Sequence, residues 1–229
     1  MSLPLSKRLK ACCRYIKTGD RVADIGCDHG YLSIYVLLEG IASSVIAADI
    51  NQGPLDSAIR NAHKFSVDDR IEFYISDGVQ NIPRDFTTLV CAGMGADTMV
   101  SILESAPWLR SEQYRLILQC QSKIHMLRKY LSENGWMINE ESVLRDGRFL
   151  YTVMDVIWQP GKSNLTVGQY YFPPALLKSG SDELPEYFQQ LLFRLRRAVN
   201  GCGEDADNMM VNALRELDND PSLNFLKEN

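Results

Sequence analysis

The chain has 229 residues, of which 45% are hydrophobic and 23% charged, as expected for a globular protein of one or two domains. No apolar run reaches the roughly twenty residues of a membrane-spanning helix, and the N-terminal region is unlike a secretory signal. The net charge of −5 disfavours extended electrostatic wrapping of nucleic acid but is compatible with a local basic patch. We therefore expect a cytoplasmic protein with no membrane partner and no DNA partner.

The six cysteines and three histidines do not have the spacing of a metal site. No Cys-x-x-Cys pair occurs, so neither a zinc knuckle nor a disulfide framework is predicted. Cysteines in a reduced cytosol usually fill small apolar spaces in the core. We expect no bound metal ion.

Strand-like and helix-like patterns alternate through the first 135 residues. The predicted elements are a helix at 5–17, a strand at 21–25, a helix at 30–40, a strand at 43–50, a helix at 54–65, strands at 70–75 and 87–93, a helix at 97–105, a strand at 115–120 and a helix at 122–135. Such alternation predicts a parallel, doubly wound sheet.

The pattern changes after residue 135. Two extended runs flank Asp146-Gly147 between residues 136 and 159, which predicts a hairpin and a reversed strand at the sheet edge. The predicted fold is α/β, a doubly wound, seven-stranded, mainly parallel Rossmann-like sheet with an antiparallel last strand, as in class I methyltransferases rather than dehydrogenases. After Pro160 the chain is turn-rich and then helical, at 185–200 and 204–217. We expect a sheet domain at 1–160 and a small C-terminal helical domain at 161–229.

A glycine turn joins the first predicted strand to the next helix. Residues 24–30 read DIGCDHG, in which Gly26 and Gly30 allow a ligand to approach the backbone closely. A third glycine, typical of dinucleotide-binding loops, is absent, so the turn suits S-adenosylmethionine better than a pyrophosphate. Asp24 and the backbone around Gly26 are predicted to face the methionine moiety.

Acidic residues also follow the next two predicted strands. Asp49 lies about twenty residues after the glycine turn, where a carboxylate bonds ribose hydroxyls. Asp77 follows the third strand and can accept from the adenine amino group. The CAGMG segment at 91–95 follows the fourth strand at the expected switch point, where ligands bind in such folds. The candidate cofactor-binding residues are Asp24, Gly26, His29, Asp49, Ile50, Asn51, Asp77, Gly78, Gly93 and Met94.

Five motifs occur in order along the chain: LSKRL at 5–9, ADIGCDHGYL at 23–32, Gly53-Pro54 after Asp49, SDG at 76–78 and AGMG at 92–95. Together with the trailing helical region, they resemble the bacterial tRNA (adenine-22, N1)-methyltransferases over essentially the whole chain. The resemblance implies that the N-terminal domain binds S-adenosylmethionine, that tRNA is the substrate, and that the C-terminal helices help to hold the tRNA.

The chemistry implied by the resemblance needs little acid–base assistance. Adenine N1 has a free lone pair at neutral pH, so the protein has mainly to unstack the base, align N1 with the methyl group and tolerate a cation. We predict that Tyr31 stacks on the extruded base and that Asp28 stabilises the developing charge, while His29 holds the loop. Lys7 and Arg8 are predicted to contact phosphates. The candidate substrate-binding residues are Lys7, Arg8, Tyr31 and Gly95.

Three segments near the expected acceptor pocket depart from the family pattern. They are Gln119-Cys120-Gln121 in place of Gln-Pro-Asn, Tyr151-Thr152 in place of Tyr-Glu, and Gly93-Met94-Gly95-Ala96 in place of GMGG. Two alternatives therefore stay open, a methyltransferase for another RNA or a small molecule and a cofactor- and RNA-binding protein that has lost catalysis. A nicotinamide dehydrogenase agrees less well with the hairpin and the glycine turn. The sequence leaves open whether the protein is a monomer or a weak dimer.

Overall fold

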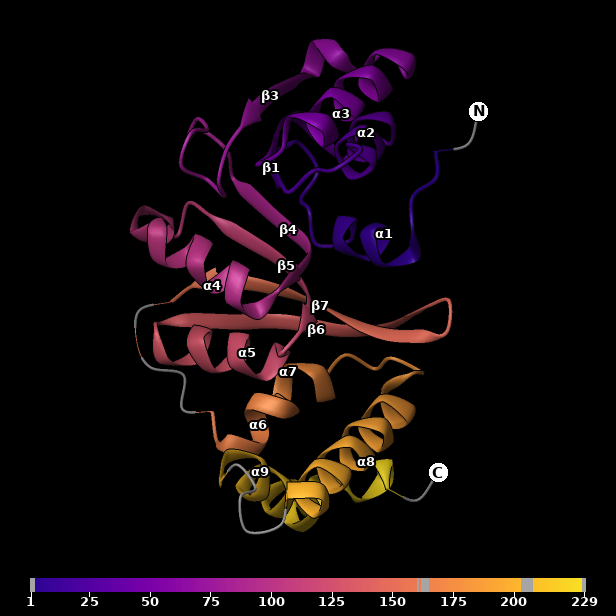
Figure 1. The fold of residues 1–229 in the computed structure, drawn as a ribbon, viewed down its shortest axis with the longest axis vertical. Coiled ribbons are helices and arrows are strands. Elements are labelled where there is room, and N and C mark those ends of the chain that lie inside the picture. Colours follow the sequence, from indigo (N-terminus) through magenta and orange to yellow (C-terminus); the bar gives the residue numbers. More distant parts are fainter. Residues whose placement is uncertain (1–2, 160, 162–164, 203–207, 228–229) are drawn as a thin grey trace.

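A computed structural model describes residues 3–159, 161, 165–202 and 208–227 (Figure 1). Within these residues the chain forms one seven-stranded sheet in the order β3-β2-β1-β4-β5-β7-β6. The strands are β1 (Asp20–Ile25), β2 (Ala42–Asp49), β3 (Ile71–Ile75), β4 (Thr88–Gly95), β5 (Arg115–Ser122), β6 (Trp136–Asp146) and β7 (Phe149–Trp158). The predicted fold class is confirmed.

The order of the strands places the switch point between β1 and β4. Strands β3, β2, β1, β4 and β5 are parallel to one another, and β7, the last strand in the chain, is antiparallel to β5. The prediction that the reversed strand forms the sheet edge is wrong, because β7 lies between β5 and β6. Strands β6 and β7 are joined by a tight turn at Gly147-Arg148 and pair along nearly their whole length, which leaves β6 at the edge.

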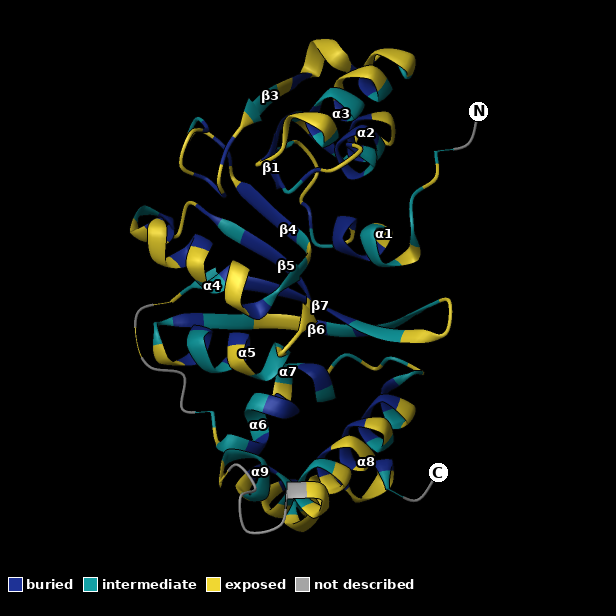
Figure 2. Ribbon diagram, in the orientation of Figure 1, coloured by how far each residue is buried: buried dark blue, intermediate teal, exposed yellow. Residues whose placement is uncertain are grey.

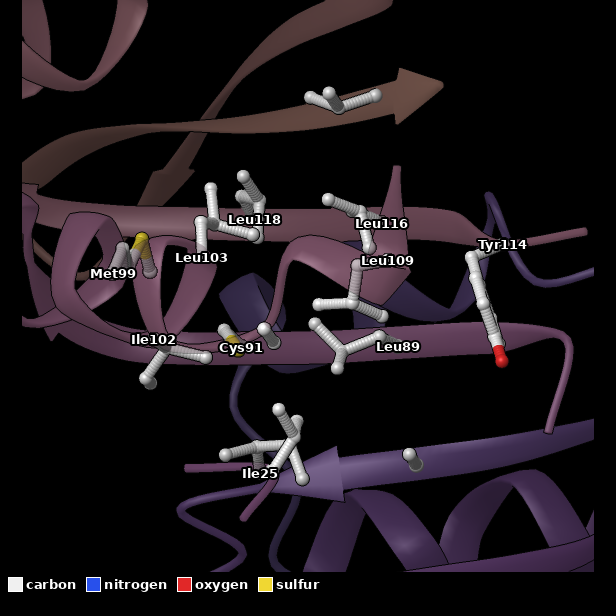
Figure 3. Packing of buried hydrophobic residues seen from close by; sticks show 14 of the residues in the cluster. Ile25, Leu89, Cys91, Met99, Ile102, Leu103, Leu109, Tyr114, Leu116 and Leu118 are labelled. Carbon is white, nitrogen blue, oxygen red and sulfur yellow. The ribbon is translucent and has the colours of Figure 1, made fainter. Parts of the chain in front are cut away.

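Helices cover both faces of the sheet and bury two apolar clusters. They are α1 (Lys7–Cys13), α2 (Tyr31–Leu38) and α3 (Gln52–Lys64) on one face, and α4 (Ala96–Ser105) and α5 (Ile124–Glu133) on the other. Figure 3 shows side chains of the cluster on the face covered by α4 and α5, in which Ile25, Leu89 and Leu118 from three neighbouring strands pack under α4. Figure 2 shows that the central strands are buried, while the tip of the β6–β7 hairpin is exposed.

The first helix is shorter than the periodicity predicts. The side chain of Ser6 caps α1 by accepting from the Leu9 N–H, and the helix ends at Cys13 rather than at residue 17. Residues 14–19 instead turn the chain into β1, with Gly19 at φ 90°. The apolar residues after Cys13 still face the core, which explains why the helical pattern continues past the end of the helix.

The described C-terminal residues, 165–202 and 208–227, form four helices, α6 (Val167–Tyr171), α7 (Pro174–Leu177), α8 (Leu184–Cys202) and α9 (Asn208–Asn219), followed by a short 3₁₀ segment at Pro221–Leu226. The two longer helices confirm the prediction where the structure describes them; residues 204–207 of the second lie outside the described residues. Helices α6 and α7 were missed because they lie in a turn-rich segment, where a capping box on Thr166 begins α6. Apolar residues of the C-terminal helices form a third cluster, which also includes Val143 of β6.

A buried ion pair links the sheet to the C-terminal helices. Arg128 of α5 and Glu141 of β6 have fully buried side chains, and Arg128 Nη2 lies 2.6 Å from Glu141 Oε1. The other terminal nitrogen of Arg128 donates to the carbonyl oxygens of Tyr170 (3.2 Å) and Tyr171 (2.7 Å) in α6. One guanidinium group therefore holds α5, β6 and α6 together. 

Candidate functional site

The glycine turn after β1 is held against the end of β2 by backbone hydrogen bonds. The N–H groups of Gly26 and Cys27 donate to the carbonyl oxygen of Ala48, at 2.8 and 3.0 Å. Gly30 has φ 70°, and a Cβ there would lie 2.9 Å from the Cβ of Ala58 in α3. Glycine is therefore required at position 30 both for the backbone conformation and for close packing against α3.

Asp49 connects this turn to the end of β2. Its carboxylate is 8% exposed and accepts from the N–H of Asp28 (3.2 Å) through Oδ2 and from the N–H of Asn51 (2.9 Å) through Oδ1. An ionised carboxylate has about four acceptor positions, so Asp49 can accept further hydrogen bonds from a ligand. The neighbouring Ile50 side chain is 60% exposed and offers an apolar surface beside the carboxylate.

Asp24 lies beneath the turn, in the interior of the protein. Its carboxylate accepts a 2.6 Å hydrogen bond from the Ser33 hydroxyl of α2. Burial raises the pKa of Asp24 to about 6, the Ser33 hydrogen bonds oppose this shift, and the nearby Asp49 adds to it. A cationic ligand group close to Asp24 would favour its ionised form. The predicted contact of Asp24 with a methionine moiety stays a prediction.

The loop after β3 lies at the same edge of the sheet. The N–H of Ser76 donates to the carbonyl oxygen of Asp49 at 3.0 Å. Asp77, the next residue in the chain, therefore lies beside the end of β2. Asp77 is exposed, and Gly78 (φ 57°) packs closely against Ile102 of α4. The structure thus brings the second and third predicted acidic positions to adjacent strand ends.

The Gly93–Gly95 segment forms the bulged end of β4 rather than a loop after it. Pairing with β5 shifts register on both sides of Met94, and Gly93 has φ 84°. The N–H of Gly93 donates to Oε1 of Gln119 at 3.1 Å, and Gln119 is fully buried. The Met94 side chain occupies the space that a Cβ on Gly26 would need, so the bulge and the glycine turn meet at the switch point.

Gln119 was missed as a functional candidate. In the sequence analysis, Gln119-Cys120-Gln121 stands out only as a departure from the family pattern. The available signal was a glutamine inside the otherwise apolar strand RLILQC, because a buried amide needs a partner. Gln119 finds that partner in the backbone of Gly93, and so holds the bulge in shape.

The two basic residues predicted to bind phosphate lie in different places. The Arg8 guanidinium lies 5.8 Å from the ring centroid of Tyr151 and 3.7 Å from the position of a Cβ on Gly93, beside the bulge. Lys7 lines a separate hollow of about 680 Å³ with Lys10 and other residues of α1 and β6. The structure therefore brings Arg8, but not Lys7, to the end of β4.

Tyr31 and its neighbours lie where the glycine turn enters α2. Tyr31 is the first residue of the helix, and its ring centroid is 5.7 Å from that of His29. The exposed Asp28 carboxylate lies 3.8 Å from Nε2 of His29, and Asn61 donates to the His29 carbonyl oxygen at 2.9 Å. Asn61, absent from the predicted set, thus anchors the residue next to Asp28 from α3.

The described residues contain neither a cluster of metal-ligating side chains nor a helix that could span a membrane. No three His, Cys, Asp or Glu side chains gather there as a metal site would require. No described helix has both the length and the apolar character needed to cross a bilayer. Cys12, Cys13, Cys27, Cys91 and Cys120 are free and buried, as expected of core fillers, and the side chain of Cys202 lies outside the described part.

Comparison with known proteins agrees with this geometry. The chain is 34% identical over 153 residues, 66% of its length, to the tRNA (adenine(22)-N(1))-methyltransferase of Bacillus subtilis, and the match spans 64% of that relative. The structure of the B. subtilis M1A22 tRNA methyltransferase is similar at TM-score 0.80 and 28% identity, with 99% of both chains covered. A Streptococcus pneumoniae protein solved in complex with S-adenosyl-L-methionine is similar at TM-score 0.81 and 25% identity, over 97% of this chain and 99% of the other. Residues 5–154 match the family described as "Methyltransferase domain", and the chain belongs to this family.

Proposed function

We propose that this protein transfers a methyl group from S-adenosylmethionine to N1 of an adenine in tRNA, at the position numbered 22. The similarity to the B. subtilis enzyme supports the reaction and the substrate. The structural observation that carries the proposal is the Asp49 carboxylate, which is anchored by the backbone of the glycine turn and still has free acceptor positions. It lies at the carboxyl edge of the sheet, close to the switch point, where ligands of such folds bind.

The residues at this edge suit the chemistry of S-adenosylmethionine. Asp49 would accept from the ribose hydroxyls, the exposed side chain of Ile50 would pack on the adenine, and Asp77 with Gly78 would face the adenine amino group. Asp24, Gly26 and His29 would lie on the methionine side, with Asn51, Gly93 and Met94 completing the surroundings. At Gly93 no side chain comes closer than 3.5 Å to the position of a Cβ, so a ligand could approach the backbone there, whereas at Gly26 the corresponding space is filled by Met94.

When bound, S-adenosylmethionine supplies an electrophilic methyl group on a sulfonium centre. The acceptor needs no general base, because adenine N1 already has a lone pair at neutral pH. The protein has to hold the base out of its stack and in line with the methyl group. Tyr31 would stack on the base, and the exposed Asp28 carboxylate would stabilise the positive charge that the product base acquires.

Contacts with the rest of the tRNA would come from both parts of the chain. Arg8 would bind a phosphate beside the acceptor, Lys7 would bind another at the start of α1, and Gly95 would line the acceptor pocket. We assign residues 1–160 to a catalytic domain and residues 161–229 to a helical domain that helps to hold the tRNA. We propose that the protein acts in the cytoplasm, where its substrate is found, and that it is a monomer or weak dimer.

The proposed reaction is tested by incubating the purified protein with S-adenosylmethionine labelled in its methyl group and with bulk tRNA, followed by digestion to nucleosides. We expect the label in 1-methyladenosine, and a tRNA transcript with another base at position 22 should accept none. Label in a different nucleoside would contradict the proposed acceptor. Binding of S-adenosylhomocysteine without any labelled nucleoside would instead indicate a protein that has lost catalysis.

Replacing Tyr31 with alanine should slow methyl transfer far more than it weakens cofactor binding. Stacking of a base on an aromatic ring contributes about 1–3 kcal/mol, so we expect kcat/KM for tRNA to fall by roughly tenfold to a hundredfold. The measurement pairs single-turnover kinetics with calorimetry of S-adenosylhomocysteine. Tyr31→Phe keeps the ring and should stay close to the wild type. If Tyr31→Ala lowered cofactor affinity as much as it lowered the rate of methyl transfer, the result would argue against stacking.

Cofactor binding should weaken in acid if Asp24 faces the ammonium group of the methionine moiety. Only ionised Asp24 attracts that cation, and its pKa is raised to about 6 by burial, so protonation sets in as the pH falls through 6. Between about pH 7.5 and about pH 5 we expect Kd for S-adenosylhomocysteine to rise roughly tenfold. The Asp24→Asn variant should bind more weakly at neutral pH and should lose most of this pH dependence. An equally steep profile in the variant would assign the effect to another group.

A further inference from the structure

A second cavity lies beside the candidate site, between the sheet and helix α8. Its volume is about 590 Å³, within the range of about 300–1,000 Å³ typical of ligand sites. The sheet contributes the end of β5 with the segment after it, at residues 120–125, and the start of β7 at 149–152, whereas α8 contributes Leu191, Arg194 and Leu195. Ser122, in its wall, has Oγ 2.8 Å from the position of a Cβ on Gly95, so the cavity begins beside the residue that is proposed to line the acceptor pocket.

Aromatic rings and Arg194 line this cavity, and two further arginines lie against the rings. Phe149 is 52% exposed, Tyr151 follows it on the same side of β7, and Arg148 lies over the Phe149 ring at 4.8 Å. Among the described residues no ion pair involves Arg8, Arg148 or Arg194, although the chain as a whole carries a net charge of −5. An exposed ring such as Phe149, beside a half-buried ring and arginines, is the chemistry that binds single-stranded nucleic acid.

We propose that this cavity holds the tRNA nucleotide next to the methylated adenine, in an unstacked conformation. Phe149 stacks on its base, Tyr151, whose ring is inclined at 64° to that of Phe149, contacts the edge of the base, and Arg194 of α8 binds its phosphate. The inference depends on the proposed function, since it takes the acceptor to be an RNA nucleotide. On this inference α8 helps to position the substrate directly, because α8 forms the wall of the cavity opposite the bulge of β4. Extrusion of the acceptor leaves its neighbour partly unstacked, and this cavity would stabilise that arrangement.

The test uses the full-length protein and a tRNA transcript with 2-aminopurine at either neighbour of the acceptor adenine. We expect stacking in the cavity to quench 2-aminopurine at one of these two positions when wild-type protein binds. Phe149→Ala should abolish this quenching and raise Kd for the tRNA about tenfold, because one stacked base contributes about 1–3 kcal/mol. Phe225→Ala is the matched control, since Phe225 is also exposed (56%) but lies in the C-terminal 3₁₀ segment.

Arg194→Ala, with Arg197→Ala as its control, tests the contribution of α8. Both arginines are exposed residues of this helix, but only Arg194 lines the cavity. We expect Arg194→Ala to raise Kd for the tRNA about fivefold or more and to reduce the salt dependence of binding, with Arg197→Ala staying near the wild type. Binding of S-adenosylhomocysteine should be unchanged in all four variants.

The outcomes separate this inference from the proposed function. Unchanged quenching in Phe149→Ala, or equal effects of the two arginine substitutions, would overturn the cavity assignment while methylation of tRNA by the wild type persists. Failure of the wild-type protein to bind or methylate any tRNA would overturn the proposed function, and the cavity assignment with it.

Discussion

Replacing Glu141 with glutamine is expected to lower the free energy of unfolding by about 3–5 kcal/mol. The substitution keeps the size of the side chain but leaves the Arg128 guanidinium without its counter-charge in a site where both side chains are fully buried. The loss should be visible in thermal denaturation as a fall in Tm of roughly 6–20 °C. Because Arg128 also holds α6, limited proteolysis should cleave the C-terminal helices sooner in the variant.

Two controls define what this result means. Glu140→Gln removes the same charge from the adjacent, exposed position of β6 and should leave Tm within a few degrees of the wild type. The double variant Arg128→Met with Glu141→Gln removes the isolated charge and should recover part of the lost stability. An unchanged Tm in Glu141→Gln would show that water or another group neutralises Arg128.

Replacing Asp49 with alanine is expected to raise Kd for S-adenosylhomocysteine by about two orders of magnitude. Hydrogen bonds to a charged acceptor contribute about 1.5–3 kcal/mol each, and the proposed contacts to the two ribose hydroxyls would both be lost. The substitution also removes the acceptor for the N–H groups of Asp28 and Asn51, which fixes the glycine turn. Calorimetry of S-adenosylhomocysteine, with thermal denaturation of the free variant, separates loss of binding from loss of folding.

Asp69→Ala is the matched control for this substitution. Asp69 is an exposed carboxylate in the 3₁₀ turn before β3, away from the carboxyl edge of the sheet, and its removal should leave cofactor affinity unchanged. Asp49→Asn, which keeps one acceptor oxygen, should lie between the alanine variant and the wild type. A folded Asp49→Ala protein with wild-type affinity would refute the proposed cofactor site.

The parts of the site that the sequence predicted all follow from local rules. A turn such as DIGCDHG needs glycine at φ 70°, and residues placed directly after parallel strands must gather at one edge of the sheet. The sequence alone therefore predicts that Asp49 and Asp77 lie near each other. Their hydrogen bonds could not, because the partner of Asp49 includes the backbone of Asp28, 21 residues earlier.

The parts that the sequence did not predict depend on contacts between distant segments. Arg8 reaches Gly93 and Tyr151, and Gln119 supports Gly93 across two paired strands; no periodicity in the chain encodes either contact. The place of β7 inside the sheet was also mispredicted, because a hairpin signal shows that two strands pair but not which of them joins β5.

The sequence by itself determined the alternation of strands and helices, the glycine turn and the acidic residues at the strand ends, since these depend on neighbours within a few residues. Only the tertiary structure decided that α8 lies beside the end of β5, that Arg128 holds α6 to the sheet, and that Arg8 and Lys7 diverge. These arrangements arise from burying apolar surfaces that are distant in the chain, and the hydrophobic effect that drives such burial has no direction. The partner of each surface is therefore set by how the whole chain packs.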